Sequence, residues 1–294
     1  MTKVGVIAHR DKTLGEGLGK LRVLLEVAGF TNPAWFEVSR SKEVPKVLRK
    51  MIDDGVDRVL VWGGDGTVRR SIDTIVGEGF DHVSLGILPA GTANLLAKNL
   101  NIPVDLEAAV EIALHGEPSP IDVGMMNGEY FAVMGGTGFD ARMIKDADDN
   151  GLKERFGRIG YMRATIRSMK MSPVKATIEL DGQPWFSGQA TCVLVGNVGT
   201  ILGGIKAFAD SRPTDGRLDI GVVQAKSRSE WVRVAARGLT GRVDRSPFVV
   251  IATAQKIKIE LKSKMVWQID GGDKAPAKKF KIRCIPAAVR ICQP

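Results

Sequence analysis

Continuous apolar runs alternate with helix-like spacing over the first 120 residues or so. Four runs predict buried strands, at residues 4–8, 34–38, 58–62 and 83–88. Between them, apolar residues recur at intervals of three and four, which is typical of amphipathic helices. Apolar strands that alternate with such helices predict a parallel sheet with both faces covered. We therefore expect an α/β domain over residues 1–120.

The pattern changes in the second part of the chain. Strand-like segments follow one another there with no helix of similar strength between most of them. They lie at residues 175–180, 189–197, 218–224, 256–261, 265–269 and 279–285. The Asp181-Gly182 pair between two of these segments predicts a tight hairpin turn. We expect a mainly antiparallel sandwich or barrel over residues 121–294, with the last residues returning to the first domain.

Composition narrows the choice of partners. A length of 294 residues suits two domains, and an apolar share of 44% allows cores of ordinary size. No apolar run approaches the roughly 20 residues of a membrane span, and no signal peptide is visible. Three cysteines without metal-binding spacing favour a reducing, cytoplasmic setting. The net charge of +9 favours anionic partners, and the lack of a nucleic-acid-binding motif argues against nucleic acid.

Two turns rich in glycine follow the third and fourth predicted strands. Glycine is used where a side chain would obstruct a close approach or where φ is positive. Turns at the carboxyl ends of neighbouring parallel strands share one edge of the sheet, where ligands bind. The first turn contains Gly63, Gly64, Asp65, Gly66 and Thr67, and the second contains Gly91, Thr92 and Asn94.

These turns predict a phosphate-binding site. Main-chain amides at a helix N-terminus suit phosphate oxygens. Asp65 would repel phosphate directly, so we expect a divalent cation between its carboxylate and the phosphates. The alternative is that each turn only connects a strand tightly to a helix.

The segments "GGDGTV" (63–68) and "LGILPAGTANLLAKNLNIP" (85–103) together resemble the diacylglycerol kinase catalytic-domain family of lipid kinases. Further segments occur in the family's order, at residues 120–124, 136–141, 213–219 and 267–272. The resemblance implies an α/β nucleotide-binding domain of phosphofructokinase or NAD kinase type and a second, β-sandwich domain. It also implies transfer of the γ-phosphoryl group of ATP to a lipid hydroxyl, with Mg²⁺.

The resemblance also assigns roles to residues of this chain. The residues of both glycine turns, together with Ser39, would bind ATP. Asp65 and Asp122 would surround magnesium, and Asp65 would thereby act in catalysis. Asp270 would be the catalytic base, although an Asp-Gly turn explains it equally well. A second, structural metal would be held by Asp215 and the main-chain carbonyls of Arg212 and Arg217.

Two alternatives stay open, and three departures from the family pattern motivate the second of them. The loop at residues 8–17 lacks the usual phosphate-binding sequence, Leu95 stands where many members have aspartate, and Gly272 replaces a glutamate. One alternative is an NAD kinase-like enzyme with a soluble acceptor. The other is a nucleotide-binding regulatory protein with impaired catalysis.

The segment at residues 152–170 combines an apolar stripe with basic residues at helical spacing. Such a helix can rest on an anionic bilayer, or its stripe can pack on the protein's own core. With a lipid substrate, we expect reversible peripheral contact at the inner membrane face. The sequence leaves open whether the chain forms a homodimer.

Overall fold

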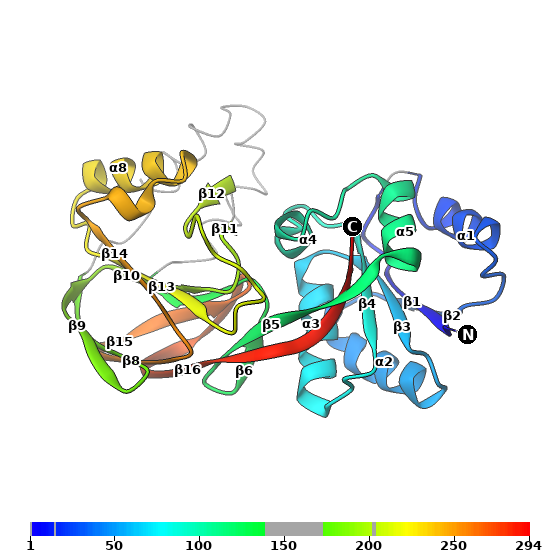
Figure 1. The fold of residues 1–294 in the computed structure, drawn as a ribbon, viewed down its shortest axis with the longest axis horizontal. Coiled ribbons are helices and arrows are strands. Elements are labelled where there is room, and N and C mark those ends of the chain that lie inside the picture. The colour runs from blue at the N-terminus through cyan, green and yellow to red at the C-terminus, as the bar shows by residue number, and fades with distance from the viewer. Residues whose placement is uncertain (1, 15, 139–172, 202–203) are drawn as a thin grey trace. The chain divides into compact units, whose positions relative to one another are not determined.

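The structure is a computed structural model that describes residues 2–14, 16–138, 173–201 and 204–294 (Figure 1). The chain divides into two compact units. Unit 1 consists of Met1–Val123 and Pro286–Pro294, and unit 2 consists of Gly124–Ile285. The C-terminal segment therefore belongs to unit 1. The predicted helix at residues 152–170 lies outside the described residues.

Unit 1 is built on a parallel sheet. Its strands lie in the order β2-β1-β3-β4, and the end of β16 pairs in parallel with β4. Every residue of β4 is buried, as expected for a strand covered on both faces. The strands are β1 (Val4–His9), β2 (Ala34–Val38), β3 (Arg58–Gly63), β4 (Ser84–Pro89) and β16 (Gly272–Gln293).

Helices cover both faces of this sheet (Figure 1). One core cluster joins α1 and α5 to side chains of β1, β3 and β4, such as Val6, Leu60 and Leu88. Helices α2 and α3 pack against each other and lie on the opposite face in Figure 1. The helical elements are α1 (Leu18–Val27), η1 (Ser41–Glu43), α2 (Val44–Asp53), α3 (Asp65–Glu78), α4 (Leu95–Asn99) and α5 (Leu106–His115).

Unit 2 is mainly antiparallel. Strands β14, β13, β10 and β7 pair in that order, and β7 continues onto β15. On this side the first half of β15 pairs with β8 in place of β7, while β16 pairs with both halves of β15. The strands are β5 (Glu117–Met126), β6 (Glu129–Phe131), β7 (Met134–Thr137), β8 (Val174–Leu180), β9 (Gln183–Ala190), β10 (Cys192–Gly196), β11 (Thr200–Ile201), β12 (Ile205–Lys206), β13 (Leu218–Val223), β14 (Val249–Ala254) and β15 (Lys256–Ile269).

The two segments predicted at residues 256–261 and 265–269 form one strand, β15. Register shifts between Glu260, Met265 and Trp267 mark where it bends from one set of partners to the other. The strand predicted at residues 189–197 is instead two strands, because the chain changes partners at Thr191. Its amide donates to Val223 O and its hydroxyl to Ala225 O, at 2.8 and 2.7 Å.

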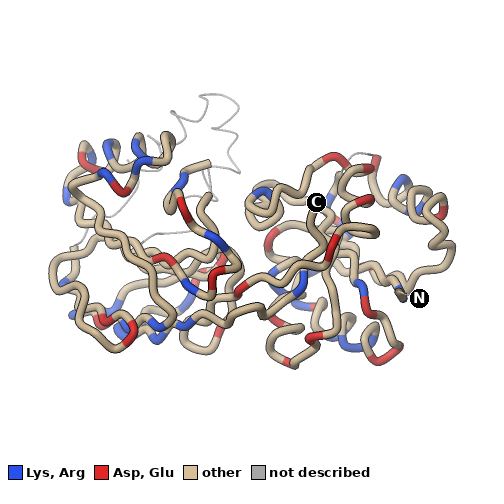
Figure 2. The backbone as a smooth tube through the Cα atoms, in the orientation of Figure 1, with Lys and Arg blue, Asp and Glu red and all other residues tan. Residues whose placement is uncertain are grey.

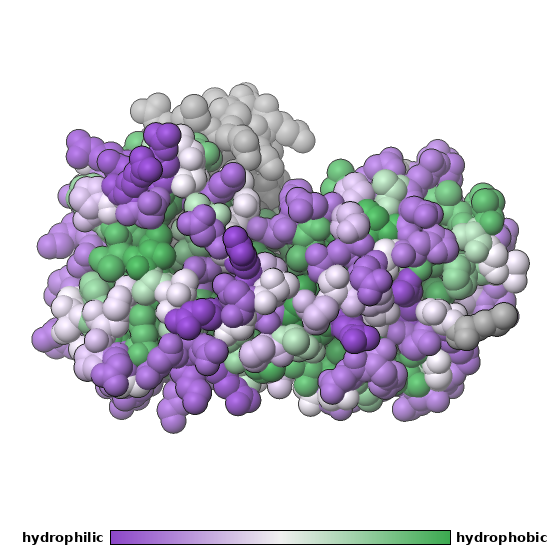
Figure 3. Space-filling view, in the orientation of Figure 1, coloured by the Kyte–Doolittle hydropathy of each residue, from purple (hydrophilic) through white to green (hydrophobic). Residues whose placement is uncertain are grey.

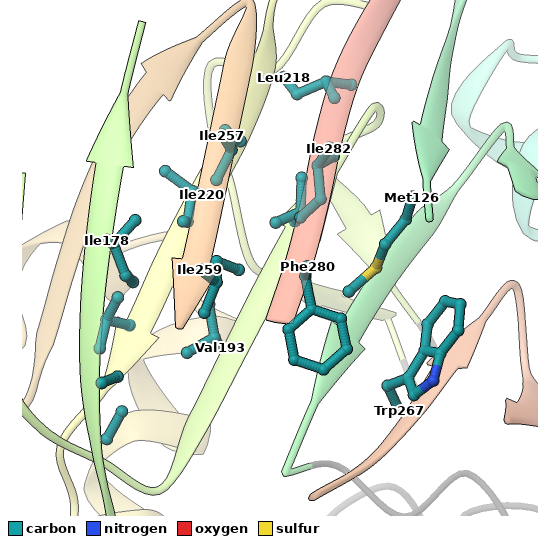
Figure 4. Close-up of a cluster of buried hydrophobic side chains, with 14 of the residues drawn as sticks. Met126, Ile178, Val193, Leu218, Ile220, Ile257, Ile259, Trp267, Phe280 and Ile282 are labelled. Carbon is teal, nitrogen blue, oxygen red and sulfur yellow. The ribbon is translucent and has the colours of Figure 1, made fainter. Parts of the chain in front are cut away.

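The inner faces of these strands form one hydrophobic core. Ile259, Val193 and Ile220 lie in one part of this core, and the ring of Phe280 lies beside Met126 and Trp267 in another (Figure 4). Helix α8 (Arg228–Leu239) was not predicted; it covers a second cluster and begins with a capping box. An α/β domain followed by an antiparallel β domain is thus confirmed. Among the residues described here, no helix is long and apolar enough to cross a bilayer.

Candidate functional site

The two glycine turns of unit 1 touch each other. Strands β3 and β4 end in register, and the amide of Ala90 donates to Gly63 O at 2.9 Å. A Cβ added at Gly91 would lie 2.4 Å from the Cα of Gly64, and one added at Gly64 would lie 3.1 Å from the Cα of Gly91. Neither glycine has a positive φ. These positions require glycine because two backbones approach closely.

The first turn leads directly into α3. A Cβ at Gly63 would lie 2.7 Å from the side chain of Thr67, which is buried under the turn. The amide of Thr67 donates to Gly64 O at 2.9 Å and closes the first turn. Gly66 is exposed, so the start of the helix is open to solvent. The sequence thus places the main-chain amides of the helix start beside the second glycine turn.

Asp65, in the first turn, is hydrogen-bonded to the start of the helix that follows the second turn. Its Oδ1 accepts a hydrogen bond from the amide of Leu95 at 2.6 Å, at the start of α4. Burial raises the pKa of Asp65 above 3.8, while hydrogen bonds from the main chain at residues 94–96 act in the opposite direction. Asp65 is therefore a desolvated carboxylate whose position is set by the second turn.

Asn94 holds the shape of the second turn. It adopts a positive φ of 48°, and its Oδ1 accepts from the amide of Gly91 at 2.9 Å. Its Nδ2 donates to Pro89 O at 3.2 Å and to Gly91 O at 2.7 Å. The buried side chain thus makes its bonds inside the turn, while Thr92 is exposed at the tip. The structure gives Asn94 a supporting place in the predicted ATP site.

Ser39 is exposed after β2, and its amide donates to Glu43 Oε2 at 3.2 Å. The hydroxyl beside the first glycine turn belongs to Ser41, whose Oγ lies 3.4 Å from Thr67 Oγ1. Sequence reasoning missed Ser41, which begins η1. The available signal was a second serine two residues after the first, near the same sheet edge.

Asp122, the other predicted magnesium ligand, is only 2% exposed on β5. Its Oδ1 accepts from the amide of Ala287 at 2.9 Å. Ala287 has a positive φ of 50°, which is strained for a residue with a side chain. The carboxylate therefore supports an irregular point in β16, and its role as a magnesium ligand stays a prediction.

Asp270 lies in unit 2, in the turn between β15 and β16, with a φ of 43°. Its Oδ2 accepts from the amide of Ala132 at 2.9 Å. Its Oδ1 accepts from the amides of Val133 and Met134, at 3.1 and 2.8 Å. The carboxylate is therefore oriented by three main-chain donors from a segment far away in the sequence. The turn interpretation describes the local geometry, and the role as a base stays a prediction.

The segment held by Asp270 is the break between β6 and β7. Its carbonyls are bound by Asn197, whose Nδ2 donates to Ala132 O at 3.0 Å and whose amide donates to Val133 O at 2.9 Å. Asn197 is 1% exposed. Sequence reasoning missed it, although a polar residue directly after the apolar run of β10 was the available signal.

The predicted second metal site lies before β13. Asp215 Oδ1 accepts from the amide of Arg217 at 2.9 Å, as in an ordinary Asx turn. Burial raises the pKa of Asp219, and the charges of Asp215 and Asp210 add to that rise. Over the described ranges, no group of three or more His, Cys, Asp or Glu side chains is arranged to hold a metal ion. A metal bound by Asp215 and the carbonyls of Arg212 and Arg217 stays a prediction.

The structure thus brings the two glycine turns, Asp65 and Ser41 together in unit 1. A close pair of main-chain turns beside a helix start offers amide donors to an anion, and a desolvated carboxylate offers a ligand to a cation. Asp270 and Asp215 belong to unit 2, where Asp270 binds the distant segment at residues 132–134 and Asp215 binds the nearby amide of Arg217.

Comparison with protein families matches both units. The profile described as "Diacylglycerol kinase catalytic domain" matches residues 9–126. The profile described as "YegS C-terminal NAD kinase beta sandwich-like domain" matches residues 133–293.

Relatives and solved structures agree with these matches. The chain is 29% identical to a diacylglycerol kinase of Bacillus subtilis over 73% of this chain and 71% of the relative. It is 26% identical to one of Staphylococcus carnosus over 90% and 87%. A crystal structure of a Bacillus anthracis protein, provisionally named a diacylglycerol kinase, has a TM-score of 0.80 at 25% identity, covering 99% of this chain and 97% of that one. An NAD kinase of Archaeoglobus fulgidus shares the fold, with a TM-score of 0.52 at 10% identity over 99% and 93%. The chain belongs to the proteins in which a diacylglycerol kinase catalytic domain, here residues 9–126, is followed by a YegS-type C-terminal domain, here residues 133–293.

Proposed function

We propose that this protein is an ATP-dependent lipid kinase that transfers the γ-phosphoryl group to a lipid hydroxyl. The observation that carries the proposal is the contact between the two glycine turns. The backbone at Gly64 leaves no room for a Cβ atom at position 91. Two turns that meet at glycines leave room for phosphate oxygens to approach main-chain amides. Membership of a kinase family supports ATP as the donor.

Asp65 fits a divalent cation. Its carboxylate is desolvated, and the hydrogen bonds that it accepts come from neutral main-chain amides, so a bound cation would balance its charge. When bound, Mg²⁺ would neutralise charge on the phosphates during transfer. The bond from the amide of Leu95 holds the carboxylate in one orientation, as a metal ligand requires.

Asp270 is the proposed proton acceptor for the attacking lipid hydroxyl. Phosphoryl transfer depends mainly on alignment and charge neutralisation, with a carboxylate placed to receive the proton. The three amides that bind its two oxygens fix the orientation of this carboxylate. Peripheral contact with the inner membrane face would bring the lipid acceptor to the enzyme.

The test is transfer of label from [γ-³²P]ATP to a total lipid extract, resolved by chromatography, with purified diacylglycerol as the first single acceptor. NAD is assayed in parallel because the NAD kinase fold is related. Labelled lipid supports the proposal. Labelled NADP would establish the alternative with a soluble acceptor, and nucleotide binding without any transfer would establish the regulatory alternative.

The role of Asp270 needs a matched control, which Asp181 provides. Asp181 also has a positive φ, of 49°, and its Oδ1 also accepts two main-chain amides, from Gln255 and Lys256. We expect Asp270→Asn to lose at least about a hundredfold in turnover and Asp181→Asn to keep full turnover. Equal activity in the two variants would refute the assignment of Asp270 as the base.

A further inference from the structure

The outward face of three neighbouring strands in unit 2 carries a regular array of basic side chains. In β15, Ile257 and Ile259 are buried, so the alternate residues Lys256 and Lys258 point away from the core. The same alternation in β16 and β8 completes the set (Figure 2). We call it the lysine face; its members are Lys175, Glu179, Lys256, Lys258, Glu260, Lys279, Lys281 and Arg283.

Two pairs of like charges lie directly opposite each other on this face. The register of β15 and β16 places Lys256 opposite Arg283 and Lys258 opposite Lys281. Directly opposed side chains of equal charge destabilise an antiparallel pair. The folding of these strands therefore does not explain the pairs.

The acidic residues of the lysine face neutralise only part of its charge. Glu179 lies 3.2 Å from Lys258, and Glu260 lies 3.3 Å from Lys279. Within the part of the chain that the structure describes, neither Lys256 nor Lys281 forms an ion pair. Lys256 and Lys281 are both exposed, so the surplus positive charge faces solvent.

We propose that the lysine face binds the anionic surface of a phospholipid bilayer, a partner that follows from the proposed lipid kinase function. Side chains on one sheet face repeat about every 4.8 Å across strands and about every 7 Å along them. This spacing presents positive charge in two dimensions, which complements a plane of headgroups. Hydrophilic side chains also dominate the lower margin of this unit in Figure 3, below β8, β15 and β16.

None of the eight residues of the lysine face is aromatic, so the face lacks the stacking platforms of single-strand binders. Duplex DNA, the other extended polyanion, becomes an outcome of the test. Another basic surface of unit 2 lies on α8, where Arg228 and Arg233 are exposed (Figure 2). Helix α8 packs on the cluster around Cys192 and Val249 and supplies a matched control.

The experiment measures vesicle binding by sedimentation for the full chain and two double variants. Lys256→Gln with Lys281→Gln removes two charges from the lysine face, and Arg228→Gln with Arg233→Gln removes two from α8. On vesicles of equimolar phosphatidylcholine and phosphatidylglycerol, each surface lysine contributes about fivefold to binding. We expect the first variant to bind about 25-fold more weakly and the second to bind within about twofold of the wild type. Vesicles of phosphatidylcholine alone should bind none of the three proteins.

Three results would overturn the proposal: an unchanged affinity of the lysine-face variant, a larger loss in the α8 variant, or tighter binding of the wild type to duplex DNA than to anionic vesicles. The variant Lys256→Glu should change stability and vesicle binding in opposite directions. It places an acid opposite Arg283, so its melting temperature should rise while its vesicle binding falls. A fall in both would show that Lys256 serves folding.

Failure of the proposed function gives a different result. Turnover on a dispersed short-chain diacylglycerol needs no bilayer, so the lysine-face variant should match the wild type there. A wild type that binds anionic vesicles but transfers no phosphate to any lipid would refute the kinase proposal and leave the membrane-binding face intact.

Discussion

The two acids assigned to catalysis, Asp65 in unit 1 and Asp270 in unit 2, are held in different ways. Asp65 accepts a short bond from the amide of Leu95 and further main-chain bonds at residues 94–96, but burial has the larger effect on its pKa. Asp270 accepts three amides from the break between β6 and β7. The turns around Asp65 are positioned by glycines that let two backbones meet. The segment beside Asp270 is positioned by hydrogen bonds to the carboxylate itself.

The difference shows that an aspartate can occupy a site that forms without it, as Asp65 does, or can hold the site in its shape, as Asp270 does. Replacement of Asp65 should leave the glycine turns largely formed, because their contact is made by main-chain atoms of Gly64 and Gly91. Replacement of Asp270 should disturb the segment at residues 132–134. Activity lost in the two variants therefore has two different meanings, which the following measurements separate.

The largest effect is expected for Asp270→Ala. Three amides, two of them on residues 2% and 3% exposed, would lose their acceptor. We expect a loss of about 3–5 kcal/mol in the free energy of unfolding, measured by urea denaturation. Asp181→Ala, whose amide partners are exposed, should lose about 1 kcal/mol or less. Equal losses in both variants would mean that Asp270 does not organise this segment.

Gly91→Ala tests the turn pair. Its Cβ would meet the backbone of Gly64 at 2.4 Å, so the turns must separate. We expect a loss of about 1–3 kcal/mol and of most nucleotide binding, by thermal unfolding and calorimetry. In Gly66→Ala the Cβ meets only Ser41 Oγ at 3.5 Å, so stability should stay the same or rise by up to about 1 kcal/mol. Unimpaired nucleotide binding by Gly91→Ala would separate the turn contact from function.

Asp65 should make stability depend on pH. Because burial raises its pKa in the folded state, the folded protein favours the protonated carboxyl. The wild type should therefore lose stability, relative to Asp65→Asn, as the pH rises from about the ordinary value of 3.8 through the folded pKa. Melting temperatures of both proteins across this range provide the measurement. A temperature difference that does not change with pH would contradict the desolvation of Asp65, and added Mg²⁺ with ATP should reduce the difference.

The smallest effect is expected for Ser41→Ala. The hydroxyl lies 3.4 Å from Thr67 Oγ1, at the limit of a hydrogen bond. We expect a loss of about 0.5 kcal/mol in stability and a rise of about two- to threefold in the KM for ATP. Ser39→Ala is the comparison, since the structure shows the amide of Ser39, and not its hydroxyl, in a hydrogen bond. A larger KM change in Ser39→Ala would restore the residue indicated by the family resemblance.

The sequence by itself determined the local elements and the edge of the sheet on which the glycine turns lie. Apolar runs and helical spacing report which residues are buried, and burial repeats with the period of the element. The strands at residues 4–8 and 58–62 are therefore found with ends within a residue or so of the structure. The Asp181-Gly182 turn is found for the same reason: both residues have the positive φ that such a turn requires.

The tertiary structure alone decided which distant segments meet. Nothing near Asp270 in the sequence indicates that its carboxylate binds amides 136 to 138 residues away, nor that Asn197 binds the carbonyls of the same segment. Strand pairing also decides that residues 256–269 form one bent strand. It likewise decides that the chain changes partners at Thr191. Side-chain periodicity states which face of a strand is buried but carries no information on its neighbour, because the neighbour is selected by packing over the whole core.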